Sequence, residues 1–195
     1  MQVPSQFILT PSSEPGIFQT EWASPEQADI GLSSEPVALR RVGETRRPRH
    51  FMYGPDSSTR LVSSAFVALL EDVDPGVHHF TPVALEMAPG EVNTGGFWLL
   101  TCGRQLSALA EESVDHLTPV LDHEGTLISI DAGTWPMLTL RRDVVAEAPF
   151  WMQMLLPAFH FCSRSFLREI SLRGLEPVAT IGCVKFESER FDDFS

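Results

Sequence analysis

Two stretches of the chain, VSSAFVALL (62–70) and CSRSFLREI (162–170), carry one pattern at an offset of 100 residues. In each, a serine follows the end of an apolar run and a phenylalanine stands three residues later. A serine in this place, here Ser63 or Ser163, accepts from the unpaired N–H groups of a first helical turn. The pattern therefore predicts two serine-capped helices, each entered from a strand, with the phenylalanine turned into the core.

Each predicted helix is followed by a glycine-bearing turn, at Gly76 and Gly174, and then by a strand, over 79–86 and 177–186. Pro82 predicts that the first of these strands lies at an edge or a bulge. Further strands are expected at 95–101, 127–130 and 138–141. Helices mixed with hairpin-like strands, without regular βαβ alternation, predict an α+β fold with a mixed or mostly antiparallel sheet, a few short helices and two serine-capped strand–helix–strand units.

The chain of 195 residues is long enough to fold as one domain, 1–195. Residues 1–60 are rich in proline, serine and glycine and predict a loop-rich N-terminal part with one or two short strands. The core is expected over 61–187, with an acidic tail at 188–195. Within the core, a helical turn is expected at 106–110, and the apolar segment 144–157, with two prolines, is expected to be a loop or short helix.

The charge is strongly negative, with 26 acidic against 14 basic residues and a net charge of −12. Such a surface repels phosphate backbones, so nucleic-acid binding is unfavourable, whereas a basic protein partner is favoured. The apolar content of 43% excludes a disordered tail, and three cysteines do not make a disulfide scaffold.

The cysteines and the N-terminal stretch predict where in the cell the protein is found. Cys102, Cys162 and Cys183 are an odd number without CxxC spacing, which predicts reduced thiols in the core of a cytoplasmic protein. The N-terminal stretch resembles no secretory signal, and no run approaches the ~18 apolar residues of a membrane span. We expect neither a membrane nor a cofactor as a partner.

One basic segment interrupts the acidic chain. Six of the 13 arginines lie within Arg40–Arg60, beside only Glu44 and Asp56. The segment could bind RNA or a phospholigand in an adaptor or regulatory module. The other interpretation is that it pairs with the protein's own acidic surface or is solvated.

Histidines and acids offer one enzymatic alternative. The chain contains two Asp-His pairs seven residues apart, Asp115-His116 and Asp122-His123. They could act in a metal-dependent hydrolase if their side chains converged on one metal ion. Pro119 between them breaks any helix that would align the two pairs. Ser63 and Ser163 do not lie in a GxSxG motif, and capping explains both. No set of nucleophile, base and orienting group is found, which disfavours an enzyme.

The repeat also carries a family resemblance. Residues 163–170 with 173–178, and 61–63 with Phe80-Thr81-Pro82-Val83, resemble two blocks of the eleventh numbered immunity family of bacterial polymorphic toxin systems. The likeness covers about residues 60–100 and 155–187. It implies a small cytoplasmic α+β protein, encoded beside a toxin gene, that neutralises the toxin by binding it. The resemblance brings no catalytic residues.

An immunity protein of this charge is expected to hold a basic toxin through acidic residues around an aromatic anchor. The contact candidates are acids of the first helix and of the 111–115 cluster, together with one tryptophan: Glu71, Asp72, Asp74, Glu111, Glu112, Asp115 and Trp135. The oligomeric state is left open by these patterns.

Overall fold

The structure is a computed structural model that describes residues 6–11, 19–23, 35–42, 48–56, 58–114, 117–131, 138–146, 148–175, 178–181 and 184–186. These residues form sheets of seven and five strands, two separate two-stranded sheets and four short helices. Most neighbouring strands are antiparallel, and three pairs are parallel. The predicted α+β class with a mixed sheet is confirmed. Cys183, Pro177 and the acidic tail 188–195 lie outside the described residues.

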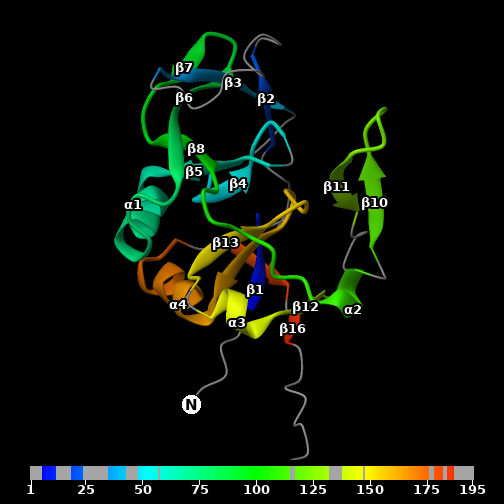
Figure 1. Ribbon diagram of the computed structural model, residues 1–195. Coiled ribbons are helices and arrows are strands. Elements are labelled where there is room, and N and C mark those ends of the chain that lie inside the picture. Colours follow the sequence, from blue (N-terminus) through cyan, green and yellow to red (C-terminus); the bar gives the residue numbers. More distant parts are fainter. Residues whose placement is uncertain are drawn as a thin grey trace, which may run out of the picture.

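The seven-stranded sheet forms the upper part of the molecule in Figure 1, in the order β2-β3-β6-β8-β5-β4 with β7 paired to β6. Its strands are β2 (Gln19–Trp22), β3 (Val37–Val42), β4 (Phe51–Tyr53), β5 (Arg60–Ser63), β6 (His79–Ala88), β7 (Glu91–Asn93) and β8 (Phe97–Thr101). Three of them come from residues 1–60, where one or two short strands in a loop-rich part were expected, so that prediction is wrong. Their buried residues, such as Leu39 and Met52, pack with β5, β6 and β8 in one core cluster.

Pro82 lies where β6 changes its neighbours. Residues 79–82 pair with β8, and pairing with β3 begins at Val83. A proline, which has no N–H to donate, is tolerated at such a junction because the second ladder starts only after it. β6 as a whole lies inside the sheet, but its half that contains Pro82 pairs with β8 alone, so the expected edge position holds at Pro82 and not for the rest of the strand.

The five-stranded sheet lies below, in the order β15-β1-β14-β13-β9. Its strands are β1 (Gln6–Pro11), β9 (Gln105–Leu106), β13 (Phe150–Gln153), β14 (His160–Ser163) and β15 (Val178–Ile181). Two predictions fail here. Residues 150–153, expected in a loop or short helix, form a strand buried along its whole length, and the helical turn expected at 106–110 is replaced by β9 and an isolated bridge from Leu109 to Leu140.

The two-stranded sheets lie at the lower and right-hand sides of Figure 1. They are β10 (Thr118–Leu121) with β11 (Leu127–Asp131), antiparallel, and β12 (Leu138–Leu140) with β16 (Val184–Phe186), parallel. Short helix α2 (Glu111–Val114) precedes β10 in the chain, and short helix α3 (Arg142–Val145) follows β12. The predicted strands at 127–130 and 138–141 are thereby confirmed, and β10, which contains Pro119, was not predicted.

Both serine-capped units are confirmed. In α1 (Ser64–Val73) the N–H of Phe66 donates to Oγ of Ser63 at 3.2 Å, and α4 (Arg164–Leu172) begins in the same way from Ser163 at 3.1 Å. After the helices, Gly76 and Gly174 adopt left-handed backbone conformations with φ of 70° and 64°, which a glycine reaches without strain.

The repeated structural unit extends further towards the N-terminus than the repeated sequence pattern does. An antiparallel strand precedes each unit, with Phe51 opposite Val62 in one and Phe150 opposite Cys162 in the other. The serine N–H also donates to an equivalent carbonyl in both units, that of His50 or of Pro149. Each unit is therefore a β-hairpin followed by a helix.

Four phenylalanine rings join the two units. Within the units, the Phe51 and Phe66 centroids lie 5.2 Å apart at 34°, and those of Phe150 and Phe166 lie 5.4 Å apart at 37°. Between the units, Phe66 meets Phe166 edge-on at 6.0 Å. All four belong to one buried cluster, which also receives residues of β1 and β8. The core thus lies between the two sheets, with α1 and α4 along one side (Figure 1).

We predict that Phe166→Ala lowers the free energy of unfolding by about 3–5 kcal/mol, because it opens a cavity where the two units meet. Urea denaturation followed by circular dichroism measures the change. Val92→Ala on exposed β7 is the control and is expected to change it by less than about 0.5 kcal/mol. A small loss for Phe166→Ala would mean that the aromatic cluster does not join the units.

Candidate protein interface

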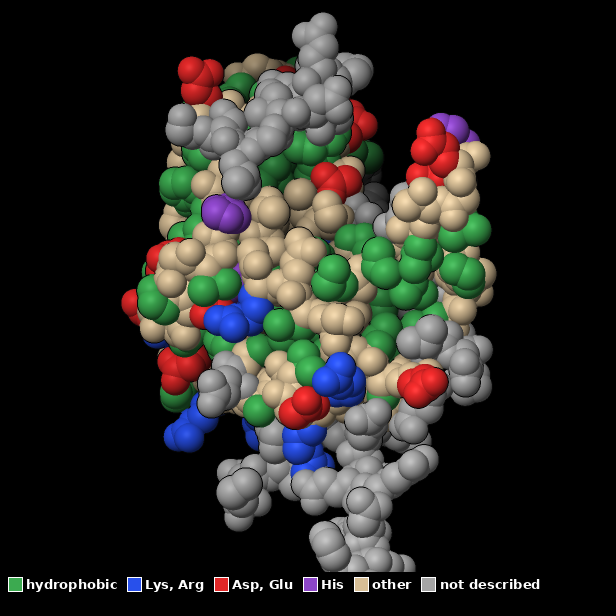
Figure 2. Space-filling view, viewed as in Figure 1, with side chains coloured by type: hydrophobic (Ala, Val, Ile, Leu, Met, Phe, Trp, Pro, Cys, Tyr) green, Lys and Arg blue, Asp and Glu red, His purple; other side chains and the backbone are tan. Residues whose placement is uncertain are grey.

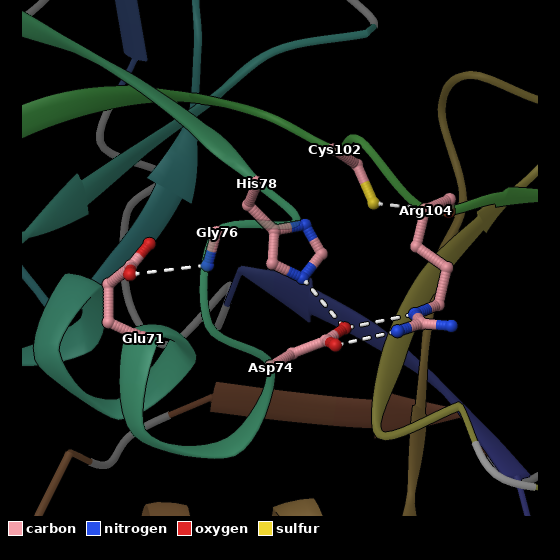
Figure 3. Close-up of polar contacts among 6 residues, drawn as sticks. All are labelled: Glu71, Asp74, Gly76, His78, Cys102 and Arg104. Atoms are coloured by element: carbon pink, nitrogen blue, oxygen red, sulfur yellow. Dashed lines mark hydrogen bonds and ion pairs between the residues drawn. The ribbon is translucent and has the colours of Figure 1, made fainter.

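The end of α1 is tied to the segment after β8 by one carboxylate (Figure 3). Asp74, the C-cap of α1, is 8% exposed in its side chain. Nε of Arg104 donates to Oδ2 of Asp74 at 2.9 Å, and Nη2 donates to Oδ1 at 2.6 Å. Nε2 of His78 lies 3.3 Å from the same Oδ2. Because two-point contact with a carboxylate fixes a guanidinium, Asp74 acts first as a tether inside the protein.

The other two acids of α1 named as contact candidates also have partners within the chain. Oε2 of Glu71 accepts from the N–H of Gly76 at 3.4 Å, which closes the turn after α1. Oδ2 of Asp72 accepts from Nη1 of Arg173 at 2.7 Å, which joins α1 to the end of α4. Both side chains remain exposed at the surface.

The second group of contact candidates lies near α2. Glu111 begins this helix and is exposed. Glu112 belongs to α2, but its side chain lies outside the described residues, as do Asp115 and Trp135 altogether.

A depression of about 730 Å³ opens between the end of α1, α3 and α4. Val73, Pro149, Phe166 and Leu172 give it apolar walls, and Asp74 and Glu169 supply carboxylates. The Asp74 carboxylate is held by Arg104, and Oε2 of Glu169 lies 3.5 Å from Nε of Arg173. Arg168 completes the charged lining.

Two of the four residues of the hydrolase alternative, Asp122 and His123, lie in the part of the chain that the structure describes. Asp122 and His123 lie in the turn between β10 and β11, and Asp115 and His116 fall outside the described residues. Oδ1 of Asp122 accepts from the N–H groups of Glu124 and Thr126 at 2.8 and 2.9 Å, so this carboxylate shapes the turn. Among described residues, no group of three His, Cys, Asp or Glu side chains is placed to hold a metal ion.

The basic segment is largely engaged by the chain itself. Nε of Arg40 donates to Oε2 of Glu86 at 3.2 Å, and Nη1 of Arg40 lies 3.9 Å from Oε1 of Glu21. Arg60 is 2% exposed and donates to the carbonyls of Thr59 and Ala158; burial lowers its pKa to about 10. For Arg40 this agrees with pairing to the protein's own acidic surface. Arg46 and Arg47 lie outside the described residues.

The described cysteines are core residues, as predicted. Cys102 and Cys162 are buried, free thiols. Burial raises the pKa of Cys102 to about 12 and raises that of Cys162 further, so neither carries the thiolate that nucleophilic chemistry requires.

Two buried histidines flank the ring of Phe150. His78 meets it edge-on with centroids 5.5 Å apart, and His160 stacks on it at 5.6 Å. Neither ring nitrogen of His160 has a hydrogen-bond partner among the described residues. Burial, reinforced by the charge of Arg60, holds the pKa of His160 well below its ordinary value, and burial also lowers the pKa of His78. Both imidazoles are therefore neutral core groups.

Exposed apolar side chains gather on and beside a projecting hairpin, hereafter the arm. The arm is formed by residues 118–131 of β10, β11 and their turn. Among described residues, five of the eight exposed large hydrophobic side chains lie on the arm or on the turn beside its base: Val120, Leu121, Leu127, Met154 and Leu155. Figure 2 shows the arm standing clear of the upper part of the body, with hydrophobic side chains along it and acidic side chains and a histidine at its tip.

The arm belongs to a segment with a one-sided charge. Residues 105–140 contain six acids and no lysine or arginine, and thus carry half of the net charge of −12. This surface was not predicted, because Pro119 lies within β10 and disfavours a strand there. The signal that could have revealed the segment is the absence of lysine and arginine across 36 consecutive positions.

The comparison with known proteins places the chain in a family. Residues 12–184 match the model of the immunity protein family Imm11, so the chain belongs to that family. This confirms the resemblance carried by the serine-capped repeat. A search of the curated proteins finds no match. Among the described residues, no helix has the length and apolarity to cross a membrane.

We predict that the protein loses stability as the pH falls from 7.5 to 5.5. The unfolded chain binds protons at histidine near pH 6.5, whereas buried His78 and His160 resist protonation in the fold. Stability is therefore full above this value and is lost below it, by up to about 1.4 kcal/mol per pH unit for each histidine.

Urea midpoints measured across this range test the prediction. His160→Phe, which keeps the ring stack on Phe150, is expected to flatten the pH dependence. His123→Gln at the exposed tip of the arm is the control and leaves the slope unchanged. An unaltered slope in His160→Phe would show that this histidine is not buried in its neutral form.

Proposed function

We propose that the protein is an immunity protein that neutralises a cognate toxin by binding it in a stoichiometric complex, without catalysing a reaction. The observation that carries this proposal is the match to the immunity family over residues 12–184. The use of Cys102, Asp122, His78 and His160 in packing and turn geometry supports it, since none of these side chains is presented for chemistry.

The proposed partner is basic. A net charge of −12 attracts such a protein over a distance of about a Debye length and raises the association rate. Paired body charges such as Arg173 with Asp72 and Arg40 with Glu86 contribute little to this field, because each pair is close to neutral. We therefore assign a large part of the attraction to the acids of residues 105–140, which carry half of the net charge and include Glu111, Glu112 and Asp115, with Trp135 in the same segment.

We also propose that the 195 residues act as one domain in the cytoplasm, where the toxin would act. A single domain is supported by the buried cluster that contains Phe51, Phe66, Phe150 and Phe166. Its residues come from both large sheets and from the two serine-capped helices, α1 and α4. Such a core cannot be divided without exposing the rings on each side.

Co-expression with the toxin tests neutralisation. The product of the adjacent gene is expected to stop bacterial growth when induced alone, and growth is expected to return when this chain is induced with it. The two proteins should co-purify, and sedimentation should give one copy of each. Growth arrest that persists at full expression of the folded chain would refute the proposal, and so would rescue by an amount far below one chain per toxin.

The charge component has its own test. The association rate constant is predicted to fall at least about tenfold between 50 mM and 500 mM NaCl, with a smaller change in the dissociation rate constant. Stopped-flow fluorescence at increasing salt measures the first constant. An association rate that does not respond to salt would mean that the partner is not drawn by the negative surface.

A further inference from the structure

We propose that the arm, together with the Met154–Leu155 turn at its base, is the element by which the protein docks its partner, and that it enters an apolar cleft rimmed by lysine and arginine side chains. This inference rests on the proposed function and adds the contact surface and the chemistry of the surface that receives it.

The apolar side chains of the arm are placed for insertion into a cleft. Val120 and Leu121 follow one another on β10 and are both exposed, and the ladder shifts register between them, so the ribbon is irregular where its apolar side chains lie. Leu127 lies opposite Leu121 and is exposed with it. A two-stranded ribbon is a marginal structure in water, and a partner that encloses it would remove its exposed apolar side chains from solvent.

The arm is nevertheless well fixed. At its tip, Asp122 accepts two N–H groups, and Gly125 takes the left-handed conformation that the tight turn requires, with φ of 81°. At its base, the N–H of Ile130 donates to the carbonyl of Leu155 at 2.8 Å, and Leu117 and Ile130 pack on a buried cluster. A surface held in its bound shape loses little conformational freedom on association, which favours tight binding.

Leu155 marks the base of the arm as a constrained position. Among described residues it is the one non-glycine residue with positive φ, 66°, a conformation that costs energy and persists only when its surroundings hold it. Its carbonyl holds the arm through Ile130 and also accepts from the Ser129 hydroxyl, while its side chain and that of Met154 remain exposed. The strained turn therefore extends the apolar surface of the arm onto the body.

The charge of the arm determines which kind of molecule can dock on it. The tip carries Asp122 and Glu124 beside His123, and no lysine or arginine occurs anywhere from residue 105 to 140. A second copy of the chain would bring two such segments together, and nucleic acid would bring phosphates; both are repelled. A protein cleft with an apolar floor and a basic rim satisfies the leucines and the acids at once.

The first test compares matched variants in the binding assay with the purified product of the adjacent gene. Leu121→Ser with Leu127→Ser is expected to raise Kd at least about tenfold, whereas Val42→Ser with Val92→Ser, exposed valines on the upper sheet, should change it less than about twofold. Glu124→Lys is expected to slow association more than Glu91→Lys, which makes the same charge change on exposed β7. Thermal melting confirms that each variant is folded.

The second test needs no substitution. Hydrogen exchange of the wild-type complex is expected to show new protection in 118–131 and 152–156. Protection confined to α1, α4 and the depression between them, or equal binding by the arm and control variants, would overturn the docking surface while leaving neutralisation intact. If the wild-type chain neither binds nor rescues, the proposed function fails and the docking surface fails with it.

Discussion

The contact between two hairpin–helix units through four phenylalanine rings is the constraint on which the rest of the fold depends. Each unit has one apolar helix face and one apolar sheet face, and neither can be covered within the unit. The rings of Phe51 and Phe66 pack with nearly the same geometry as those of Phe150 and Phe166, which gives the two units similar apolar surfaces. The surfaces meet where Phe66 contacts Phe166 edge-on. Once they meet, the seven-stranded and five-stranded sheets are fixed on either side, and His78 and His160 are enclosed beside Phe150.

The connection between the units has a buried part and an exposed part. Leu138 and Leu140 of β12 belong to a second buried cluster with Ile8 and Trp151 of the five-stranded sheet, whereas the arm projects from this base. Connections on a rigid scaffold can vary without loss of the core, which is why binding elements are so often found in them. The arm fits this pattern because its base is packed and hydrogen-bonded while its tip contacts solvent.

The sequence predicted those parts of the fold that depend on local chemistry. Ser63 and Ser163 were identifiable as caps because capping needs only the serine and the three residues after it. β13 was missed because its residues are apolar on both faces, so no alternation separates a buried strand from a buried helix or loop. The first strand of each unit was missed because Phe51 and Phe150 lie 11 and 12 residues before their strand partners, which breaks the register of the repeat.

The acidic residues illustrate why the interface was harder to predict than the caps. Asp72 and Asp74 look the same in the sequence as Asp122 and Glu124, but the fold gives the first two arginine partners that are 101 and 30 residues away. Only tertiary structure supplies those partners, so composition fixes the total charge and not its distribution. The arm differs because its own segment contains no arginine or lysine, and among the described residues no arginine or lysine from elsewhere pairs with Asp122 or Glu124. Folding therefore neutralises acids of the body and leaves those of the arm to act on whatever approaches it.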